Sequence, residues 1–374
     1  MQANPQENRY ARQALLPDLG REGQAMLARA RVVIVGCGAL GSVAAELLGR
    51  AGVGLREAGG ELRLIDRDIV EWTNLHRQTL YAEVDALAGR PKAAAAQDAI
   101  QRINGDVNAM GMVADCTSTT ILDLVGAAPT VLLDGTDNFE TRFLLNDVAV
   151  KQGVPLVYAG AVATKGMLAT ILPAWEVGAE APAWSPGPCL RCLIDVPAPG
   201  STETCDTAGV LGPVSAAVAS FQAVEAIKIM LGRFDLLRRH VLEFDPWHRE
   251  FNRLAMDAPD PKCPCCGGRR FEFLEALAGA GSVVLCGSDA VQITPKVVAS
   301  VDLAALAGKL AQMGTFEATP WMVRGTLEGE ACDEACDGDG QSLRLSVFAD
   351  GRAIVHGTRR IERARAIYAK YVGQ

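Results

Sequence analysis

Two short cysteine motifs have the spacing of metal ligands. Cys189 and Cys192 enclose two residues in CLRC, and Cys263 and Cys266 enclose two in KCPCCGG. Four thiolates from two such turns form a tetrahedral structural zinc site. A pair of redox C-x-x-C motifs is the alternative, but those usually begin a helix that follows a strand. The spacing therefore favours Zn²⁺ held by these four cysteines, with Cys265 as a spare thiol inside the second motif.

Composition narrows the chemistry further. The 374-residue chain is 49% hydrophobic and 21% charged, which is typical of a packed protein. No segment reaches the ~18 apolar residues of a membrane span, and the polar start lacks a signal peptide, so we expect a cytoplasmic protein without membrane contact. In that reducing compartment, eleven cysteines favour metal or thiol chemistry over disulfides. The net charge of −8 argues against nucleic-acid binding, which needs clustered Lys and Arg.

A glycine hexad, GCGALG, predicts a phosphate-binding loop. Gly36 permits a tight turn, Gly38 lets the backbone approach a phosphate, and Gly41 lets the next helix pack closely on the strand. The start of that helix offers free N–H groups and the positive end of its dipole. Asp66 ends the following predicted strand, where a carboxylate can bind ribose hydroxyls. A glycine-rich turn that binds nothing is the alternative, but strand, helix and acid together favour a nucleotide.

Three polar residues beyond Asp66 bear on which nucleotide is bound, because the hexad alone also fits an NAD enzyme. They are Asn74, Arg77 and Lys92. Lys92 lies in the first turn of a predicted helix, where the dipole disfavours a cation unless it faces an anion. The planar fork of Arg77 also suits phosphate. Each alone fits a solvated loop, but together they favour a nucleotide with more phosphate charge than NAD, such as a triphosphate.

Asp137, in LLDGTDN, lies just past the carboxyl end of a predicted strand. In open parallel sheets this is the edge that binds the ligand. A carboxylate there can hold Mg²⁺, which keeps few protein ligands and bridges phosphates. An Asx turn at the corner is the alternative.

The elements that must position these residues alternate between strand and helix, which predicts an α/β, Rossmann-like fold with a mostly parallel sheet. The expected strands are residues 31–36, 61–66, 107–113, 130–138 and 154–160. The expected helices are residues 20–30, 39–52, 91–104, 117–126, 139–153 and 212–232. A Pro- and Gly-rich stretch at 173–189 predicts a crossover segment, which the zinc site would clamp.

A change of pattern near residue 275 predicts a second domain. We expect one domain at 1–272, which carries all of the motifs above, and a small α+β domain at 275–374. In the latter, Asp350-Gly351 between two alternating runs predicts a β-hairpin.

Several motifs occur together, in order, in a known family. They are RYARQ from residue 9, VGCGALGS from 35, LIDRDIVEWTNLHRQTL from 64, GRPKAAAA from 89, GTDN from 135, CLRC from 189 and TCDTAGVLGPVSAAVASFQAVEAIK from 204. Over about residues 8–270 the chain resembles the ubiquitin-activating-enzyme-like adenylyltransferases of the MoeB/ThiF/HesA branch. The resemblance implies ATP-dependent adenylylation of the C-terminal glycine carboxylate of a ubiquitin-fold sulfur-carrier protein ending in Gly-Gly, which prepares it for thiocarboxylate formation.

The resemblance also implies cofactors, partners and residue roles. We expect ATP with Mg²⁺, a homodimer, and a separate protein as sulfur donor. In the resembling enzymes the matching positions would act as follows: Gly38 and Gly41 line the phosphate loop, Asp66 holds the ribose, Asn74, Arg77 and Lys92 contact the phosphates, and Asp137 binds Mg²⁺. Arg12, in RYARQ, would reach the triphosphate in the other subunit.

Cys205, in TCDTAG, is a candidate nucleophile, because a nearby helix start can lower the pKa of a thiol. The resemblance implies a covalent carrier adduct at this position in the thiazole branch and no clear need for it in the molybdopterin branch. Two other functions stay open: adenylation of a different acceptor (a peptide, a small molecule or a tRNA base), and non-catalytic docking of a ubiquitin-like partner.

Overall fold

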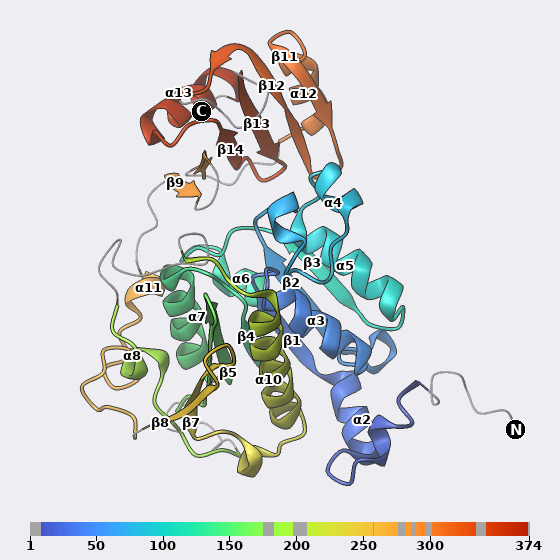
Figure 1. Ribbon diagram of the computed structural model, residues 1–374, viewed down its shortest axis with the longest axis vertical. Helices are drawn as coiled ribbons and strands as arrows, with labels where there is room; N and C mark the ends of the chain where they lie inside the picture. Colours follow the sequence, from blue (N-terminus) through green and yellow to red (C-terminus); the bar gives the residue numbers. More distant parts are fainter. Residues whose placement is uncertain are drawn as a thin grey trace, which may run out of the picture. The chain divides into compact units, whose positions relative to one another are not determined.

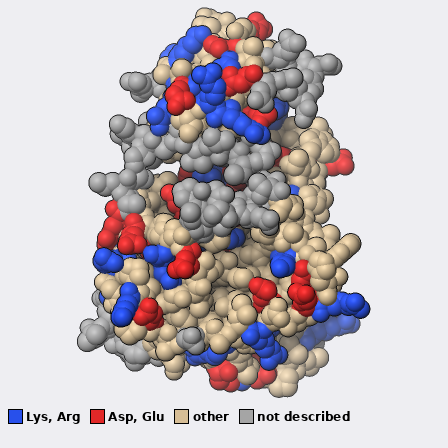
Figure 2. Space-filling model, turned by 60° about the vertical axis from the view of Figure 1, so that its left-hand side comes forward, with Lys and Arg blue, Asp and Glu red and all other residues tan. Residues whose placement is uncertain are grey.

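The computed structural model describes residues 9–174, 183–196, 208–256, 258–275, 282–285, 289–295, 301–333 and 342–372. Cys205 lies outside these residues. The chain forms two compact units, Met1–Ala276 and Leu277–Gln374 (Figure 1). On the face drawn in Figure 2, acidic and basic side chains are interspersed.

The first unit is built on an eight-stranded sheet in the order β3-β2-β1-β4-β5-β6-β7-β8. Its strands are β1 (Arg31–Val35), β2 (Glu61–Asp66), β3 (Ala109–Val113), β4 (Val131–Asp134), β5 (Leu156–Val162), β6 (Lys165–Ile171), β7 (His240–Asp245) and β8 (Glu250–Ala255). The pairs from β3 to β5 are parallel, whereas β5 to β8 pair antiparallel. The predicted parallel α/β sheet is therefore confirmed, and an antiparallel extension adds β6, β7 and β8 to it.

Helices cover both faces of this sheet. One face carries α3 (Gly41–Arg50), α5 (Lys92–Ile103) and α10 (Gly212–Met230), and the other carries α6 (Ile121–Val125) and α7 (Phe139–Gln152). In β1, Val32 and Ile34 join the first core while Val33 and Val35 join the second. Side chains that alternate in this way give a strand that is apolar throughout, because both of its faces are buried.

Helix α10 packs beside α3 and against β4, β5 and β6 (Figure 1). Its buried Gln222 donates from Nε2 to the carbonyl oxygens of Asp134 and Val157, both at 2.8 Å. A polar side chain is thus accommodated inside the first core by two backbone acceptors of the sheet.

Shorter elements complete the first unit. They are η1 (Gln13–Leu15), α2 (Gly20–Arg29), η2 (Arg56–Ala58), η3 (Trp72–Asn74), α4 (Glu83–Leu87), α8 (Leu190–Leu193), η4 (Phe234–Leu236) and α11 (Glu272–Glu275). No helix in the described part of the chain is both long and apolar enough to cross a membrane.

The second unit is a six-stranded antiparallel sheet in the order β11-β12-β13-β14-β10-β9. Its strands are β9 (Ser282–Leu285), β10 (Ala290–Ile293), β11 (Gly314–Ala318), β12 (Met322–Ala331), β13 (Ser342–Phe348) and β14 (Ala353–His356), and its helices are α12 (Leu303–Leu310) and α13 (Ile361–Tyr371). β13 and β14 pair across Asp350-Gly351, so the predicted hairpin is confirmed.

Candidate functional site

The phosphate loop is held by backbone packing between glycines. Gly36 has a φ of +87°, which favours glycine. A Cβ on Gly41 would lie 1.8 Å from the carbonyl oxygen of Gly36, and one on Gly135 would lie 2.3 Å from that oxygen. By contrast, a Cβ on Gly38 would meet nothing closer than Gln78 Nε2, at 3.9 Å. Gly36 and Gly41 therefore shape the loop, whereas Gly38 leaves open space where a ligand can approach the backbone.

Asp66 closes the loop from the end of β2. Its carboxylate accepts hydrogen bonds from the backbone N–H of Cys37, at 2.6 Å, and of Asp68, at 2.7 Å. Burial raises the pKa of Asp66 to about 6. The hydroxyl of Tyr81 donates to the carbonyl oxygen of Cys37 at 2.7 Å and fixes the loop from the other side.

Lys92 lies at the start of α5 and is buried. Its Nζ is 3.2 Å from Asp68 Oδ2. Burial alone would lower the pKa of Lys92, but Asp68, Asp66 and Asp137 surround it and raise it well above its usual value. The ammonium group therefore stays charged, and the helix-start cation faces carboxylates of its own chain.

Arg67 was not singled out from the sequence, although it belongs to this cluster. Its guanidinium pairs with Asp115 at 3.1 Å, and the charges of Asp68 and Asp137 also act on it. The cluster thus places two cations and several carboxylates together at the carboxyl ends of the parallel strands, where open α/β sheets bind ligands.

Asn74 and Arg77 lie in and just after η3. Asn74 is buried, and its Oδ1 accepts from the N–H of Glu71 at 3.0 Å. Arg77 is half-buried and donates from Nη1 to the carbonyl oxygen of Thr73 at 2.6 Å. In this arrangement Asn74 shapes the turn that carries Arg77.

Gln78 is a further candidate residue, not predicted from the sequence. It is buried, its Nε2 is the nearest atom to a Cβ added at Gly38, at 3.9 Å, and its Oε1 has no hydrogen-bond partner among the described residues. A buried polar atom beside the loop suits a ligand contact. Its position directly after Arg77 was the only available signal in the sequence.

The GTDN corner follows β4 and leads into α7. Asp134 is buried and accepts from the N–H of Thr136 at 2.9 Å, and Asn138 caps α7 by accepting from the N–H of Thr141 at 2.8 Å. These two residues make the turn, while Asp137 is exposed. The Asx-turn role that was the alternative for Asp137 is therefore filled by its neighbours.

Arg12 lies away from this cluster. It is exposed, and the adjacent Gln13 donates from Nε2 to the carbonyl oxygen of Ala51, at 3.1 Å. Ala51 caps the C-terminal end of α3, whereas the phosphate loop lies at its N-terminal end. A ten-residue helix spans about 15 Å, so Arg12 is far from the phosphate loop of its own chain.

The four cysteines predicted as metal ligands do come together. The sulfur atoms of Cys189, Cys192, Cys263 and Cys266 all lie within 4.8 Å of one another. Two of the separations are 3.7 Å and 3.4 Å. A tetrahedral ion with bonds of about 2.3 Å would set its sulfurs about 3.8 Å apart, so the spacing fits zinc.

Helix α7 supports this cluster from its buried side. Asn146 donates from Nδ2 to Cys265 Sγ at 3.3 Å and accepts on Oδ1 from the N–H of Leu190 at 2.8 Å. Asp147 accepts from the N–H of Phe273, at 2.9 Å. Cys265 thus packs against α7 and is not one of the clustered ligands, as expected of the spare thiol.

Cys332, in the second unit, is disulfide-bonded. This residue is an exception to the expected preference for metal or thiol chemistry, which the seven free cysteines among the described residues follow. The composition of the whole chain could not distinguish one cysteine from another.

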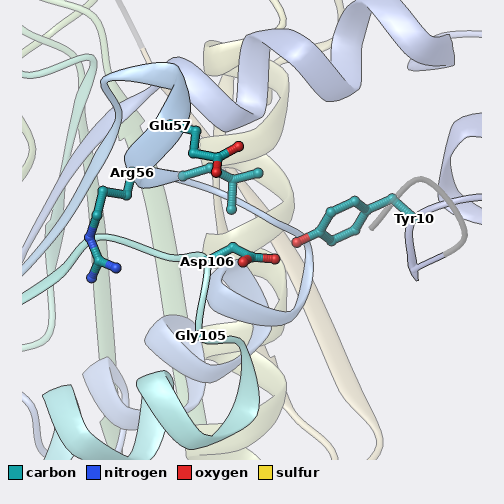
Figure 3. Close-up of a pocket in the computed structure, with 6 residues that line it drawn as sticks. Tyr10, Arg56, Glu57, Gly105 and Asp106 are labelled. Carbon is teal, nitrogen blue, oxygen red and sulfur yellow. The ribbon is translucent and has the colours of Figure 1, made fainter. Parts of the chain in front are cut away.

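A pocket of about 150 Å³ opens at the amino ends of the parallel strands, opposite to the phosphate loop (Figure 3). It is lined by Tyr10, Leu55, Arg56, Glu57, Gly105 and Asp106. Residues 55–57 precede β2 and residues 105–106 precede β3, so the pocket faces the amino ends of these strands. It is therefore separate from the phosphate loop.

Comparison with known proteins places this geometry in a family context. A model of the ThiF family matches residues 10–265. The chain is 39% identical to the sulfur carrier protein ThiS adenylyltransferase of Bacillus subtilis, over 98% of this chain and 99% of that one. It is 36% identical to the SAMP-activating enzyme E1 of Haloferax volcanii, over 73% of this chain and 93% of that one. Its fold is similar to that of E. coli MccB solved with ATP, with a TM-score of 0.56 at 23% identity over 70% of this chain and 74% of that one.

Proposed function

Because the chain belongs to the ThiF family, we propose that it adenylates the C-terminal glycine carboxylate of a ubiquitin-fold sulfur-carrier protein, using ATP. The observation that carries this proposal is the near full-length likeness to the Bacillus subtilis protein, an adenylyltransferase of the sulfur carrier ThiS. The open Gly38 supports it, because it offers bare backbone to a phosphate, and Lys92 adds positive charge at the start of α5.

The reaction joins two anions. A carboxylate oxygen of the carrier attacks the α-phosphorus of ATP, and the bond from that phosphorus to the oxygen bridging to the β-phosphate breaks. Pyrophosphate leaves, and the carrier acyl-adenylate remains for a separate sulfur donor to convert to the thiocarboxylate. The carboxylate is already ionised near neutral pH, so no general base is required. The protein contributes charge neutralisation and alignment.

We assign these tasks to the residues of the loop edge. Asp66 accepts hydrogen bonds from the ribose hydroxyls, and the Gly38 backbone faces the phosphates. Lys92 and Arg77 neutralise phosphate charge, while Asn74 holds the turn that presents Arg77. Asp137 is exposed beside this cluster and suits Mg²⁺, which would neutralise further phosphate charge.

Arg12 would serve the partner subunit of a homodimer. It is exposed and lies at the far end of α3 from its own phosphate loop. An arginine side chain cannot cover the length of this helix. Within a dimer, the same side chain would add positive charge to the triphosphate of the other copy.

We assign a structural Zn²⁺ to the cluster of four cysteines. The ion would tie the crossover segment around α8 to the stretch after β8. We place the adenylation in residues 1–272 and assign no chemistry to residues 275–374. Cys205 remains a candidate for a covalent carrier adduct, which would be a thiol-sensitive band lost in Cys205→Ser.

ATP–pyrophosphate exchange tests the proposal. With a carrier ending in Gly-Gly present, the wild type should exchange label and Asp137→Ala should not. Asp123→Ala removes another exposed carboxylate, on α6, and should exchange like the wild type. Undiminished exchange in Asp137→Ala would refute the assignment of that residue. No exchange by the wild type with any such carrier would favour the alternative of a non-catalytic docking protein.

A further inference from the structure

The N-terminal arm, residues 9–16, is hydrogen-bonded at the amino-terminal side of the sheet, away from the phosphate loop. Arg9 donates from Nη1 to the carbonyl oxygen of Ile103 at 3.0 Å, at the end of α5. Gln13 donates to the carbonyl oxygen of Ala51 at 3.1 Å, at the end of α3. The arm therefore bridges the C-terminal ends of two helices, α3 and α5, which begin at the phosphate loop and at Lys92.

Tyr10 is the central anchor of this arm. Its ring lies directly over Gly52, where an added Cβ would be 2.5 Å from Tyr10 Cζ. Its hydroxyl accepts a hydrogen bond from Asn104 Nδ2 at 2.7 Å. Asn104 is fully buried and also donates to the carbonyl oxygen of Gly49 at 2.8 Å, so the acceptor is held by a rigid donor. Figure 3 shows the Tyr10 hydroxyl pointing from the arm toward Asp106.

Beyond Tyr10 the arm exposes one cationic and two large apolar side chains to solvent. Arg12 is exposed, Leu15 is 80% exposed, and Leu16 is 57% exposed. No ion pair of Arg12 occurs within the described ranges. Two adjacent exposed leucines beside a cation without an ion-pair partner suit burial against another protein surface.

We propose that Tyr10 is a positioning residue for a subunit-crossing arm. A latch, the Tyr10–Asn104 hydrogen bond over Gly52, fixes the arm so that Arg12 and the two leucines dock on a second copy of this chain. This inference rests on the proposed function, in which Arg12 reaches the triphosphate of that copy. The latch lies two residues before Arg12, so little backbone freedom separates the anchor from the guanidinium. Fixing the arm beforehand lowers the entropy lost when Arg12 meets the phosphates.

Two substitutions of Tyr10 separate the contribution of its hydroxyl from that of its ring, and ATP–pyrophosphate exchange measures both. Tyr10→Phe removes one hydrogen bond and should lower kcat/KM for ATP by roughly fivefold. Tyr10→Ala also removes the contact with Gly52 and should lower it by on the order of a hundredfold, as expected for a misplaced catalytic group. Tyr368→Phe removes a tyrosine hydroxyl that donates to Gly351 in the second unit, and should have no effect.

Mixed dimers give a readout that a merely structural role would not produce. Tyr10→Ala and Asp137→Ala chains carrying different tags are co-expressed, and the heterodimer is purified. One of its sites has an intact Asp137 and receives Arg12 from the chain with an intact Tyr10, so exchange should return to about half of the wild-type rate per dimer. A heterodimer as inactive as both parents would overturn the trans-acting latch.

A second measurement does not depend on adenylation. Trypsin cleaves after arginine, so the rate of cleavage after Arg12 reports how firmly the arm is held. Tyr10→Ala should be cut on the order of tenfold faster than the wild type, with Tyr10→Phe in between. Equal cleavage rates in all three proteins would overturn the latch. Absence of exchange by the wild type, with faster cleavage of Tyr10→Ala, would instead overturn the proposed function and leave the latch supported.

Discussion

Alanine substitutions at two glycines of the phosphate loop should have different effects. Gly41→Ala should lower the stability of the fold, whereas Gly38→Ala should weaken nucleotide binding. In Gly41→Ala the new Cβ would lie 1.8 Å from the carbonyl oxygen of Gly36 and 3.2 Å from Ile34 Cγ2. The first of these neighbours is backbone, so the loop and α3 must move apart. In Gly38→Ala the nearest atom is 3.9 Å away, an ordinary contact with the side chain of Gln78.

The magnitudes follow from these distances. Overpacking against backbone costs typically 1–3 kcal/mol and occasionally more, so we expect Gly41→Ala to lose about 3 kcal/mol of unfolding free energy, or roughly 5–10 °C in Tm. Gly38→Ala should stay within about 0.5 kcal/mol of the wild type. Its methyl group, however, would occupy the space through which a phosphate approaches the backbone, and the affinity for ATP should fall by on the order of a hundredfold.

Thermal unfolding with and without ATP measures both effects at once. At about 100 times Kd, ATP should stabilise the wild type by about 2.7 kcal/mol. Gly41→Ala should begin from a lower Tm, whereas Gly38→Ala should begin from the wild-type Tm and show almost no shift with ATP. The explanation of the loop would be refuted if Gly38→Ala kept the full ATP shift, or if it lost as much stability as Gly41→Ala.

Three other outcomes are expected. Burial raises the pKa of Asp66 from 3.8 to about 6, so the stability contributed by this group is complete below pH 3.8 and lost as the pH rises through 6. Urea titrations should therefore show that the free energy of unfolding of the wild type falls by up to about 3 kcal/mol between pH 4 and 7, relative to that of Asp66→Asn, which lacks the titrating group. Metal analysis should find about one zinc per chain in Cys265→Ala and a loss of zinc in Cys266→Ala. Lys92→Gln should lower the free energy of unfolding, measured by urea titration, by about 1–3 kcal/mol. The loss should be smaller than for a fully buried ion pair, because the Asp68 side chain is 38% exposed.

Features set by short spacings could be predicted from the sequence. The strand before GCGALG, the helix after it and the acid at the end of β2 form one local unit, and the two cysteine motifs each make a compact turn. The pairing of the two turns, about seventy residues apart, was also predictable, because zinc needs four ligands and each turn supplies two.

Features that depend on packing between distant segments were missed. Gln78 becomes a candidate only because it lies against Gly38, and Tyr81 only because its hydroxyl reaches the Cys37 carbonyl oxygen. Lys92 does have an anion beside it, but that anion is Asp68 of the same chain, and the contact of Lys92 with a triphosphate stays a prediction. The latch joins Tyr10 to Asn104 across 94 positions, and no spacing rule connects them.

The most direct test of the account is the mass of the carrier itself. After incubation of this protein with Mg-ATP and a ubiquitin-fold carrier ending in Gly-Gly, intact-mass spectrometry should detect the carrier with one AMP attached. A carrier whose C-terminal carboxylate is amidated should stay unmodified under the same conditions. An unmodified Gly-Gly carrier, or AMP on the amidated one, would contradict adenylation at the C-terminal carboxylate.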